Sequence, residues 1–593
     1  QTWYNAGVGV IGFVLDDKEL IRYALEKEDS GHYYQMQTSI TADGMWYEGA
    51  MHYQVFVLNA LFPFMEAAHH AGLDVYQDST YKSLFDFMLD YADANLELPT
   101  INDGRLVSLT EPDRATYYEV ALRRFGDERY AAVLQATDRS DLNSLLYGVG
   151  ELPSVSMPPW RSRHFSASEL VVLRAGKDAG SLQAVLNIMA YQGGHSHPDQ
   201  LGLIVSGLGQ TLIPDAGSIR YRIPAHVDYF KQSVAHNVLV VDGQSQQHSS
   251  APALRAFVNS SSLQAATATT DQAYPGVQLA RTLLLTDEYL IDIFGANSET
   301  AHTYDWVLHC LGTLSARGLD PQPVSVPPAD TNGYEYLDNV RVTGPVEAGR
   351  QTFEWQVDPN RHLRLDQFSQ TGDRYFFADG LIAADKDDVI ADTTVPVLLA
   401  RRTAADTEYV SIIQPYGETP AVNDIREIPV LDADGQVLTR DDAWGLQIEC
   451  NGRTDLLMLA HHSDPKQLGG LVMDGRLAWA SFDGDDLQAL YLAQGTTVAG
   501  NGWAIRLDGA SSGPDVDEMG VHFEVVDPNR VSLHNSSARA VVVEMDGWLR
   551  GAVEVFELDW EGERTTAVQA DRAEGGIVRL TMEPQTAYEI RTK

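Results

Sequence analysis

The period of the hydrophobic pattern changes once along the chain, near residues 152–159, and this change limits the possible folds more than any other feature. Before it, apolar side chains recur every three or four positions, as in residues 8–25 and 47–71, which predicts amphipathic helices. After it, the period falls to two, as in residues 170–174 and 182–187. This period, with turn residues at short intervals up to the last residue, is typical of antiparallel strands. We therefore expect an α+β multidomain protein.

The length of 593 residues is too great for one hydrophobic core and predicts two to four domains. We expect an incomplete α/α toroid of stacked helix pairs over residues 1–150, a large antiparallel β-sandwich over 160–475 and a C-terminal β-sheet module over 476–593. The dense aromatic residues of the first segment suit helix pairs that pack side by side.

The charge balance narrows the classes of ligand. The chain carries 83 acidic against 42 basic residues, a net charge of −41, which argues against nucleic-acid binding. An anionic ligand is repelled at long range and needs a local cationic pocket. Acid-rich surfaces of this kind suit high salt, where screening is strong, and indicate a halophilic or marine source. The alternative is an acidic surface that only keeps the protein soluble.

Several other classes are excluded by what the sequence lacks. It has no run of 18 or more apolar residues, so we expect no membrane span. Two cysteines, Cys310 and Cys450, exclude a disulfide framework and argue against a thiolate metal site. The chain starts at Gln1 without Met or a signal-like segment, which indicates a processed form or a late-starting fragment.

A histidine cluster lies in the β half, in the segment Gly193–Gln200, which contains His195 and His197. A predicted hairpin follows it and brings Asp215 back beside His197, and His236 joins from the start of the next strand. Two histidines and one aspartate suit a zinc site, which leaves His195 for chemistry. Two alternatives stay open. The histidines can simply hydrogen-bond within a buried turn, and a cupin site also uses His-x-His, although no Glu follows here.

The helical half contains an aromatic and acidic segment, residues 43–53. Trp46, Tyr47 and Tyr53 offer surfaces that suit sugar rings, and Tyr53 can carry a proton if nearby positive charge lowers its pKa. These residues can instead be core aromatics of a helical domain. Asp43 and Glu48 can also form the acid/base pair of a glycosidase.

A basic and aromatic stretch lies between Asp215 and His236. Its members are Arg220, Tyr221, Arg222, His226 and Tyr229. They are the best candidates for a cationic pocket in this acidic chain, because an Arg fork matches a carboxylate with two hydrogen bonds. The alternative is an ordinary surface loop.

Together these residues resemble the heparinase II/III-like polysaccharide lyases, a group that includes alginate and oligoalginate lyases. The resemblance covers roughly residues 1–294 and rests on the segments 43–53, 193–199, 214–217 and 229–243. It implies an incomplete α/α toroid followed by stacked antiparallel sheets, as the hydrophobic pattern independently predicts.

The resemblance also implies roles for single residues. Tyr53 and His195 match the catalytic Tyr and His, and Arg220 resembles an Arg that binds the substrate carboxylate. His197, Asp215 and His236 match the ligands of a structural zinc ion. We expect Tyr221, Tyr229, Trp46 and Glu48 to contact substrate as well. The family's carboxylate-neutralising Asn or His aligns just before Gln1, and only Asn5 lies near that place.

The implied reaction is β-elimination in a polysaccharide that contains uronic acid, with alginate or oligoalginate as the first choice. A glycosaminoglycan or ulvan lyase of the same fold, a hydrolase using Asp43 and Glu48, and a noncatalytic carbohydrate-binding protein are the alternatives. We expect an anionic polysaccharide or oligosaccharide as partner and consider a homodimer. The expected location is secreted or periplasmic, or cytoplasmic for an enzyme acting on oligosaccharides.

Overall fold

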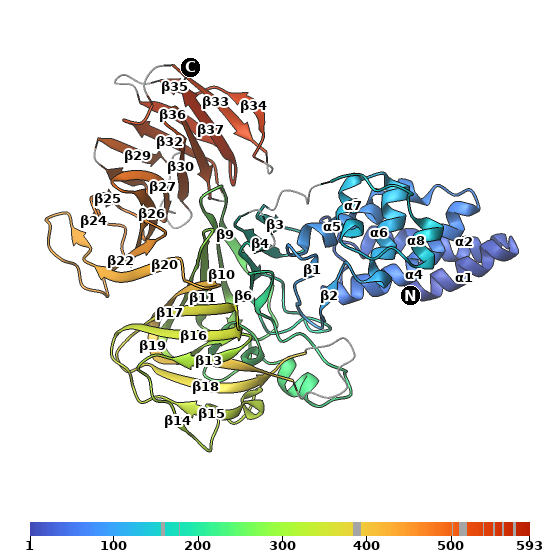
Figure 1. Cartoon of the computed structure of the whole chain (residues 1–593), viewed down its shortest axis with the longest axis horizontal. Coiled ribbons are helices and arrows are strands. Elements are labelled where there is room, and N and C mark those ends of the chain that lie inside the picture. The colour runs from blue at the N-terminus through green and yellow to red at the C-terminus, as the bar shows by residue number, and fades with distance from the viewer. Residues whose placement is uncertain are drawn as a thin grey trace.

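The computed structural model describes residues 1–592 except 156–160, 177, 179, 384–392, 501, 509–518, 538, 550–551, 560–561 and 573–576. Its first part is helical and the rest consists mainly of antiparallel strands (Figure 1). This confirms the predicted α+β class; residues 156–160 of the junction between the two patterns lie outside the described residues. The helices are α1 (Thr2–Leu15), α2 (Lys18–Glu26), α3 (His32–Thr38), α4 (Met51–His70), α5 (Ser79–Tyr91), α6 (Pro112–Phe125), α7 (Ala131–Gln135) and α8 (Leu142–Tyr147).

The apolar run over residues 8–25, read from the sequence as one segment, forms parts of two helices. Asp16 ends α1 in the left-handed conformation, with φ of 53°, which aspartate tolerates better than most residues. Asp17 then caps α2, because its carboxylate accepts hydrogen bonds from the backbone N–H groups of Glu19 and Leu20. N-caps of this type stabilise a helix start by about 1 kcal/mol.

A five-stranded antiparallel sheet joins the helices to the rest of the protein. Alternate side chains of β4 point to opposite faces, as strand geometry requires. Leu170 and Val172 belong to the hydrophobic core of the helices, whereas Val171 and Leu173 belong to the core of the next sheet. The sheet is therefore buried on both faces. Its strands, in order, are β3 (Arg163–Phe165), β4 (Leu170–Arg174), β5 (Gln183–Asn187), β6 (Gly202–Gly207) and β7 (Gln210–Ile213).

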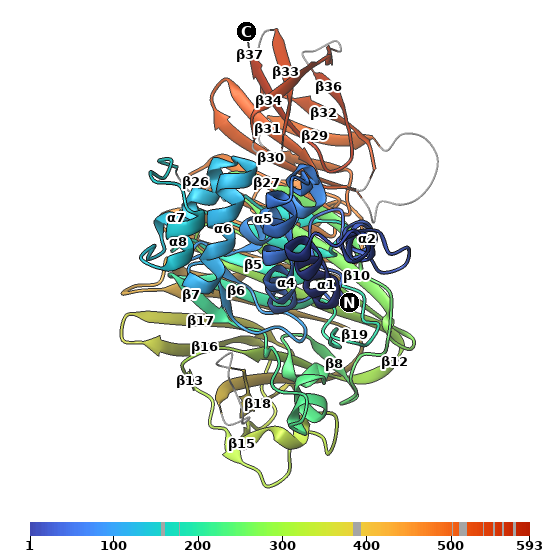
Figure 2. The same cartoon turned by 90° about the vertical axis from the view of Figure 1, so that its right-hand side faces the viewer.

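The largest sheet has 12 strands and packs against the five-stranded sheet. Its two longest strands, β12 and β19, pair along most of their length with one irregularity near residues 297–302. Figure 2 shows the helices in front of these sheets and the C-terminal strands at one end. The strands are β8 (Leu239–Val241), β9 (Ala253–Asn259), β10 (Gln264–Tyr274), β11 (Val277–Leu285), β12 (Leu290–His309), β13 (Thr313–Ala316), β14 (Gln322–Pro323), β15 (Asp338–Val342), β16 (Gly349–Asp358), β17 (Arg361–Ser369), β18 (Arg374–Leu381) and β19 (Thr394–Tyr416).

Two further sheets, of ten and eight strands, share one hydrophobic core. The first contains β20 (Val422–Ile428), β22 (Ala443–Cys450), β23 (Arg453–Ala460), β26 (Leu477–Asp483), β27 (Asp486–Ala493), β30 (Gly520–Asp527), β31 (Arg530–Asn535), β33 (Val553–Leu558), β34 (Arg564–Val568) and β37 (Ala587–Thr592). The second contains β21 (Leu431–Asp432), β24 (Lys466–Leu468), β25 (Leu471–Met473), β28 (Thr497–Gly500), β29 (Trp503–Asp508), β32 (Val541–Asp546), β35 (Asp571–Arg572) and β36 (Val578–Met582). A short two-stranded sheet, β1 (Glu97–Leu98) with β2 (Val107–Ser108), lies in the helical part.

Strand pairing shows where the chain passes from one sheet to the next, which can be compared with the predicted domain limits. The chain leaves the 12-stranded sheet after β19 and enters the ten-stranded sheet at β20. The strands β23 and β26, which lie on either side of residue 476, pair with each other. The limits 1–150, 160–475 and 476–593 stay a prediction. Among the described residues, no helix is long and apolar enough to cross a membrane.

Candidate active site

Tyr53 and His195 come from the two halves of the molecule and meet ring to ring. Tyr53 lies in the first turn of α4, just after a turn at Gly49, whose φ is 74°. His195 follows Gly193 and Gly194, with φ of 82° and 65°, a conformation that favours glycine. The ring centroids of Tyr53 and His195 are 4.2 Å apart. The boundary between the helices and the sheets therefore carries the two residues predicted to perform the chemistry.

Tyr221 completes this group. Its hydroxyl contacts the Tyr53 hydroxyl and lies 3.1 Å from His195 Nδ1. Burial, and then the nearby Glu48 carboxylate, raise the pKa of Tyr221 above its usual value. The phenol is therefore neutral near pH 7 and able to donate a proton. The structure thus joins two phenols and one imidazole in direct contact.

Glu48 reaches the same group, and Trp46 holds it there. Glu48 Oε1 is 3.4 Å from His195 Nε2, and Glu48 Oε2 accepts a 2.7 Å hydrogen bond from the Trp46 indole N–H. Trp46 itself is 4% exposed and packs in the core of the helical part. The prediction that Trp46 contacts substrate is therefore wrong, because its ring faces are covered by the protein.

Asp103 is a part of the site that the sequence analysis missed. Its buried carboxylate lies 2.9 Å from His195 Nδ1 through Oδ2 and 3.1 Å from His197 Nε2 through Oδ1. Burial alone would raise the pKa of Asp103, but the contacts with His197 and His195 and the charge of Lys231 hold it well below its usual range. In the sequence, Asn102-Asp103-Gly104 is typical of a turn, and nothing links it to histidines more than 90 positions later.

A cationic cleft opens beside Tyr53 and Tyr221, with a cavity volume of about 590 Å³. Three arginines line it: Arg105, Arg220 and Arg222. This concentration of positive charge in a chain of net charge −41 attracts carboxylates locally. The structure therefore brings Arg220 and Tyr221 to the cleft, as predicted from the sequence.

Tyr229 does not reach the cleft. It lies in the short π-helix His226–Phe230, is fully buried, and its hydroxyl is 3.4 Å from His309 Nε2. Burial raises the pKa of Tyr229 well above its usual value. The prediction that Tyr229 contacts substrate is wrong, because its ring packs inward against the 12-stranded sheet.

A buried polar cluster lies behind the cleft. The hairpin of β6 and β7 confirms the predicted route by which Asp215 returns beside the histidine segment. Ligand atoms of Asp199, Asp215 and His236 lie within 4.8 Å of one another, and the rings of His236 and His197 are 5.2 Å apart. Of the three predicted ligands, Asp215 and His236 thus share a cluster with Asp199, and His197 lies beside it.

Contacts around this cluster orient its members. His236 Nδ1 is 2.6 Å from Asp215 Oδ2, and Nε2 donates to the Phe230 carbonyl at 3.1 Å. Asp199 accepts from the Asn187 amide at 2.9 Å. Burial opposes the charged form of His236, but Asp215 outweighs it and raises the pKa of His236 to about 9. The result is a buried, oriented set of nitrogen and oxygen donors.

The donor set fits a divalent metal ion such as Zn²⁺. His236 gives its Nε2–H to a carbonyl, which leaves Nδ1 as the ligand atom, the usual arrangement for metal-binding histidines. His197 Nδ1 is buried and has no hydrogen-bond partner among the described residues. An imidazole nitrogen without a partner in a polar interior costs stability unless it binds something, so it supports the same assignment.

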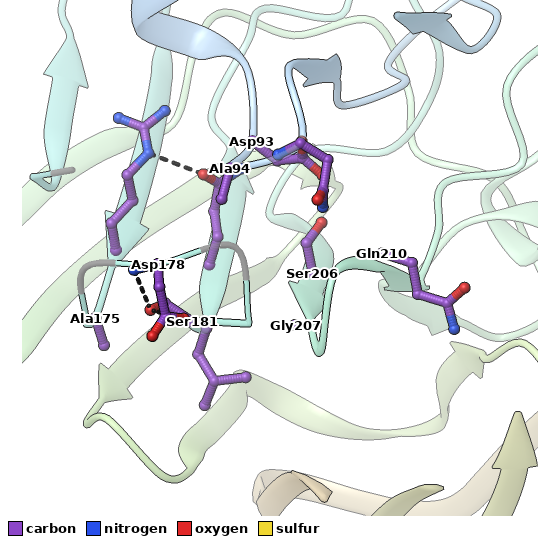
Figure 3. A pocket seen from close by; sticks show the side chains of 12 residues that line it. Asp93, Ala94, Ala175, Asp178, Ser181, Ser206, Gly207 and Gln210 are labelled. Atoms are coloured by element: carbon purple, nitrogen blue, oxygen red, sulfur yellow. Dashed lines mark hydrogen bonds between the residues drawn. The ribbon is translucent and has the colours of Figure 1, made fainter. Parts of the chain in front are cut away.

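A second pocket lies away from the cleft, between Asp93 and the end of the five-stranded sheet (Figure 3). Its cavity volume of about 10 Å³ matches one water molecule. Asp93 Oδ2 and Gln183 Nε2 line it and have no hydrogen-bond partner among the described residues. Arg174 also lines it and donates to the side chain of Gln183 at 2.8 Å. The pocket is too small for a sugar and belongs to the interior.

Comparisons with known proteins agree with this geometry. Residues 157–358 match the family described as heparinase II/III-like, C-terminal, and residues 1–97 match the alginate lyase family. An alginate lyase of Stenotrophomonas maltophilia is 26% identical over 466 residues, covering 70% of this chain and 61% of the relative. An exo-oligoalginate lyase of Saccharophagus degradans is 22% identical over 472 residues, covering 70% and 62%. The chain thus spans less than two thirds of the length of these relatives.

Solved structures give the fold. Heparinase III matches with a TM-score of 0.57 at 13% identity, over 77% of this chain and 66% of that chain. A mutant of the heparan sulfate lyase HepC from Pedobacter heparinus matches with 0.53 at 16% identity, over 72% and 61%. The molecule therefore has a heparinase III-like fold of helices and antiparallel sheets. The resemblance to the heparinase II/III-like family that the sequence indicated is confirmed.

Proposed function

We propose that the chain is a polysaccharide lyase that cleaves a uronic-acid polymer by β-elimination, with alginate or oligoalginate as its substrate. The observation that carries the proposal is the direct contact of Tyr53, His195 and Tyr221 at the mouth of a cleft lined by three arginines. The alginate and exo-oligoalginate lyases among the relatives support the choice of substrate.

The reaction needs a carboxylate partner, a base and an acid. Arg220 at the cleft pairs with the uronate carboxylate, which stabilises the negative charge that develops when the C5 proton leaves. Tyr53 or His195 takes that proton. The electron pair of the C5–H bond then forms the C4–C5 double bond as the bond from C4 to the glycosidic oxygen breaks.

The leaving oxygen requires a proton, and Tyr53 donates it. The contact between the Tyr53 and Tyr221 hydroxyls allows a proton to pass between the two phenols. Tyr221 in turn lies next to His195 Nδ1. The two phenols therefore form a proton path beside the imidazole, so Tyr221 can return a proton to Tyr53 after Tyr53 has protonated the leaving oxygen.

The buried cluster has a structural role in this proposal. Asp199, Asp215 and His236, with His197 beside them, would hold a zinc ion. When bound, the ion supplies a cross-link between the histidine loop, the end of β7 and the segment before β8. His197, two residues after His195, fixes the loop that presents His195 to the cleft.

The helical part takes the finer form of an incomplete α/α toroid in this proposal. The heparinase III-like fold supports it, and so does the packing of α1 against both α2 and α4. In such an arrangement the start of α4 faces the sheets, which is where Tyr53 lies.

The decisive experiment is ultraviolet absorbance of the unsaturated uronide during incubation with alginate, oligoalginate, heparan sulfate, chondroitin sulfate, hyaluronan and ulvan, at low and high salt. A lyase produces the new double bond and the absorbance rises. Reducing sugar without absorbance would indicate a hydrolase instead. Binding without either product by the zinc-loaded protein would overturn the proposal in favour of a carbohydrate-binding protein.

A further inference from the structure

Asp103 lines the cleft, and its carboxylate contacts two histidines: His195, which packs on Tyr53, and His197, which lies beside the buried cluster. Its Oδ2 is 2.9 Å from His195 Nδ1, and its Oδ1 is 3.1 Å from His197 Nε2. The backbone N–H of Asp103 also donates to the His195 carbonyl at 3.0 Å. The loop after α5 is thus tied to the histidine loop by one residue through three contacts.

These contacts determine which ring nitrogens carry a hydrogen. An ionised carboxylate only accepts hydrogen bonds, so Nδ1 of His195 and Nε2 of His197 are the donors. The other ring nitrogen of each histidine then carries no hydrogen. These atoms are His195 Nε2, which lies 3.4 Å from Glu48 Oε1, and His197 Nδ1, which is buried without a hydrogen-bond partner among the described residues. Asp103 therefore selects opposite tautomers in two histidines that are two positions apart.

The surroundings hold Asp103 in this place. Ser218 Oγ donates to Oδ1 at 2.9 Å, and Lys231 Nζ lies 3.7 Å from Oδ2. The neighbouring Asn102 accepts from the His197 backbone N–H at 3.1 Å and donates to the Gly49 carbonyl at 2.7 Å. Gly49 ends the turn that precedes α4, and Tyr53 lies in the first turn of that helix. The same short segment therefore connects the phenol side of the site, the imidazole and the cluster.

We propose that Asp103 is a positioning residue that couples the active site to the metal site, by fixing the ring orientation of His195 and of His197 with one carboxylate. The kinetic part of this inference rests on the proposed lyase function. The part that concerns His197 and the metal site does not rest on that function, because Zn²⁺ binding is measured without substrate.

The test is Asp103→Asn, which keeps the size of the side chain but offers one carbonyl oxygen in place of two acceptors. One histidine at most keeps its partner. We expect kcat to fall by 10²-fold or more, on the order of the effect of losing the group that orients a histidine, with KM changed less than about threefold. We expect the affinity for Zn²⁺, titrated against a competing chelator, to fall about 10- to 100-fold.

A double-mutant cycle separates positioning from general damage. In the His195→Gln background, Asp103→Asn should lower kcat no further, because the group it positions is absent, yet it should still weaken Zn²⁺ binding. Asp366→Asn is the matched control, since Asp366 is equally buried and accepts hydrogen bonds from Thr352 and contacts Arg364 outside the site. It should change stability alone.

Each possible result either supports or overturns the positioning role of Asp103. Unchanged kcat and unchanged Zn²⁺ affinity in Asp103→Asn overturn the proposal, as do fully additive losses of kcat in the double variant. If Asp103→Asn fails to fold, Asp103→Glu takes its place. This variant keeps a carboxylate but moves it. A fall in kcat with little change in the thermal midpoint supports positioning, and a lower thermal midpoint with unchanged kcat contradicts it. A wild-type protein without turnover on any uronate polymer refutes the lyase function, whereas the Zn²⁺ titration still tests the contact with His197.

Discussion

His195 and His197 are two positions apart in one loop, yet they lie in opposite environments. The side chain of His195 is 27% exposed and packs on Tyr53, which lines the cleft, whereas that of His197 is 0% exposed and lies beside a buried cluster. An exposed polar group can exchange partners with substrate, but a buried one must keep its partners because losing them costs about 1–3 kcal/mol. We therefore expect substitutions at the cleft to alter turnover and substitutions at the cluster to alter stability.

The largest expected effect tests the cleft. Tyr53→Phe removes the hydroxyl that contacts Tyr221 and keeps the ring that packs on His195. We expect kcat to fall by 10²- to 10⁴-fold, the usual contribution of a positioned acid or base, with the thermal midpoint nearly unchanged. Uronide absorbance and calorimetry measure the two. Tyr34→Phe, at an exposed position of α3, is the control, and full activity of Tyr53→Phe would refute its role.

The complementary change tests the cluster. His236→Ala leaves the Asp215 carboxylate buried without its 2.6 Å partner. Unpairing a buried charge costs about 3–5 kcal/mol, so the free energy of unfolding should fall by that amount in denaturant titrations. A chelator should lower the thermal midpoint of the wild type and leave that of His236→Ala unchanged, because a bound ion stabilises only a folded site. A wild type insensitive to chelator would contradict the metal assignment.

His52, which lines the cleft, should make the stability of the protein depend on pH. Burial first, and then the charges of Arg105 and Arg114, lower the pKa of His52 to about 4, against about 6.5 in an unfolded chain. Between these values the unfolded state binds more protons, so this contribution to stability is present above pH 6.5 and is lost as the pH falls through 4. It amounts to up to about 3 kcal/mol.

The measurement is the free energy of unfolding in urea at pH 7 and pH 4.5. His52→Gln should lose less stability between the two values than the wild type does, since glutamine does not titrate. His462→Gln, at an exposed position of the C-terminal part, is the control and should follow the wild type. An identical loss in all three proteins would show that His52 is not the group responsible.

The sequence was sufficient to predict the features that depend on local interactions. The period of two predicted the strands, and the hairpin before Asp215 follows from its turn residues, since register and turn are local properties. The sequence also named Tyr53, Arg220 and Tyr221, which line the cleft, and His195, which packs on Tyr53, because their types and spacing carry the resemblance to a known family.

The sequence was insufficient to predict burial and contacts that depend on packing between distant parts of the chain. Tyr221 and Tyr229 are the same residue type in one loop, but Tyr221 is 53% exposed and Tyr229 is fully buried, and only the sheet beneath them makes that difference. Asp103 reaches His195 across 92 positions. Trp46 looks like a sugar-stacking residue until the core of the helical part covers it. These are tertiary effects that override local preference.

Two neighbouring arginines of the cleft should differ in how they act on the substrate. Arg220 and Arg222 both line it and are exposed, but only Arg220 resembles the carboxylate-binding arginine. Arg220→Gln should raise KM about tenfold, equal to about 1.4 kcal/mol, with a smaller change in kcat, since a contact made before and during the reaction is removed. Arg222→Gln should act mainly through long-range attraction. At 1 M salt, where the Debye length is about 3 Å, its effect on KM should vanish, whereas that of Arg220→Gln should persist because a direct bidentate contact excludes the salt. Equal salt dependence of the two variants would show that the cleft attracts the polymer by its field alone and that neither arginine binds the carboxylate directly.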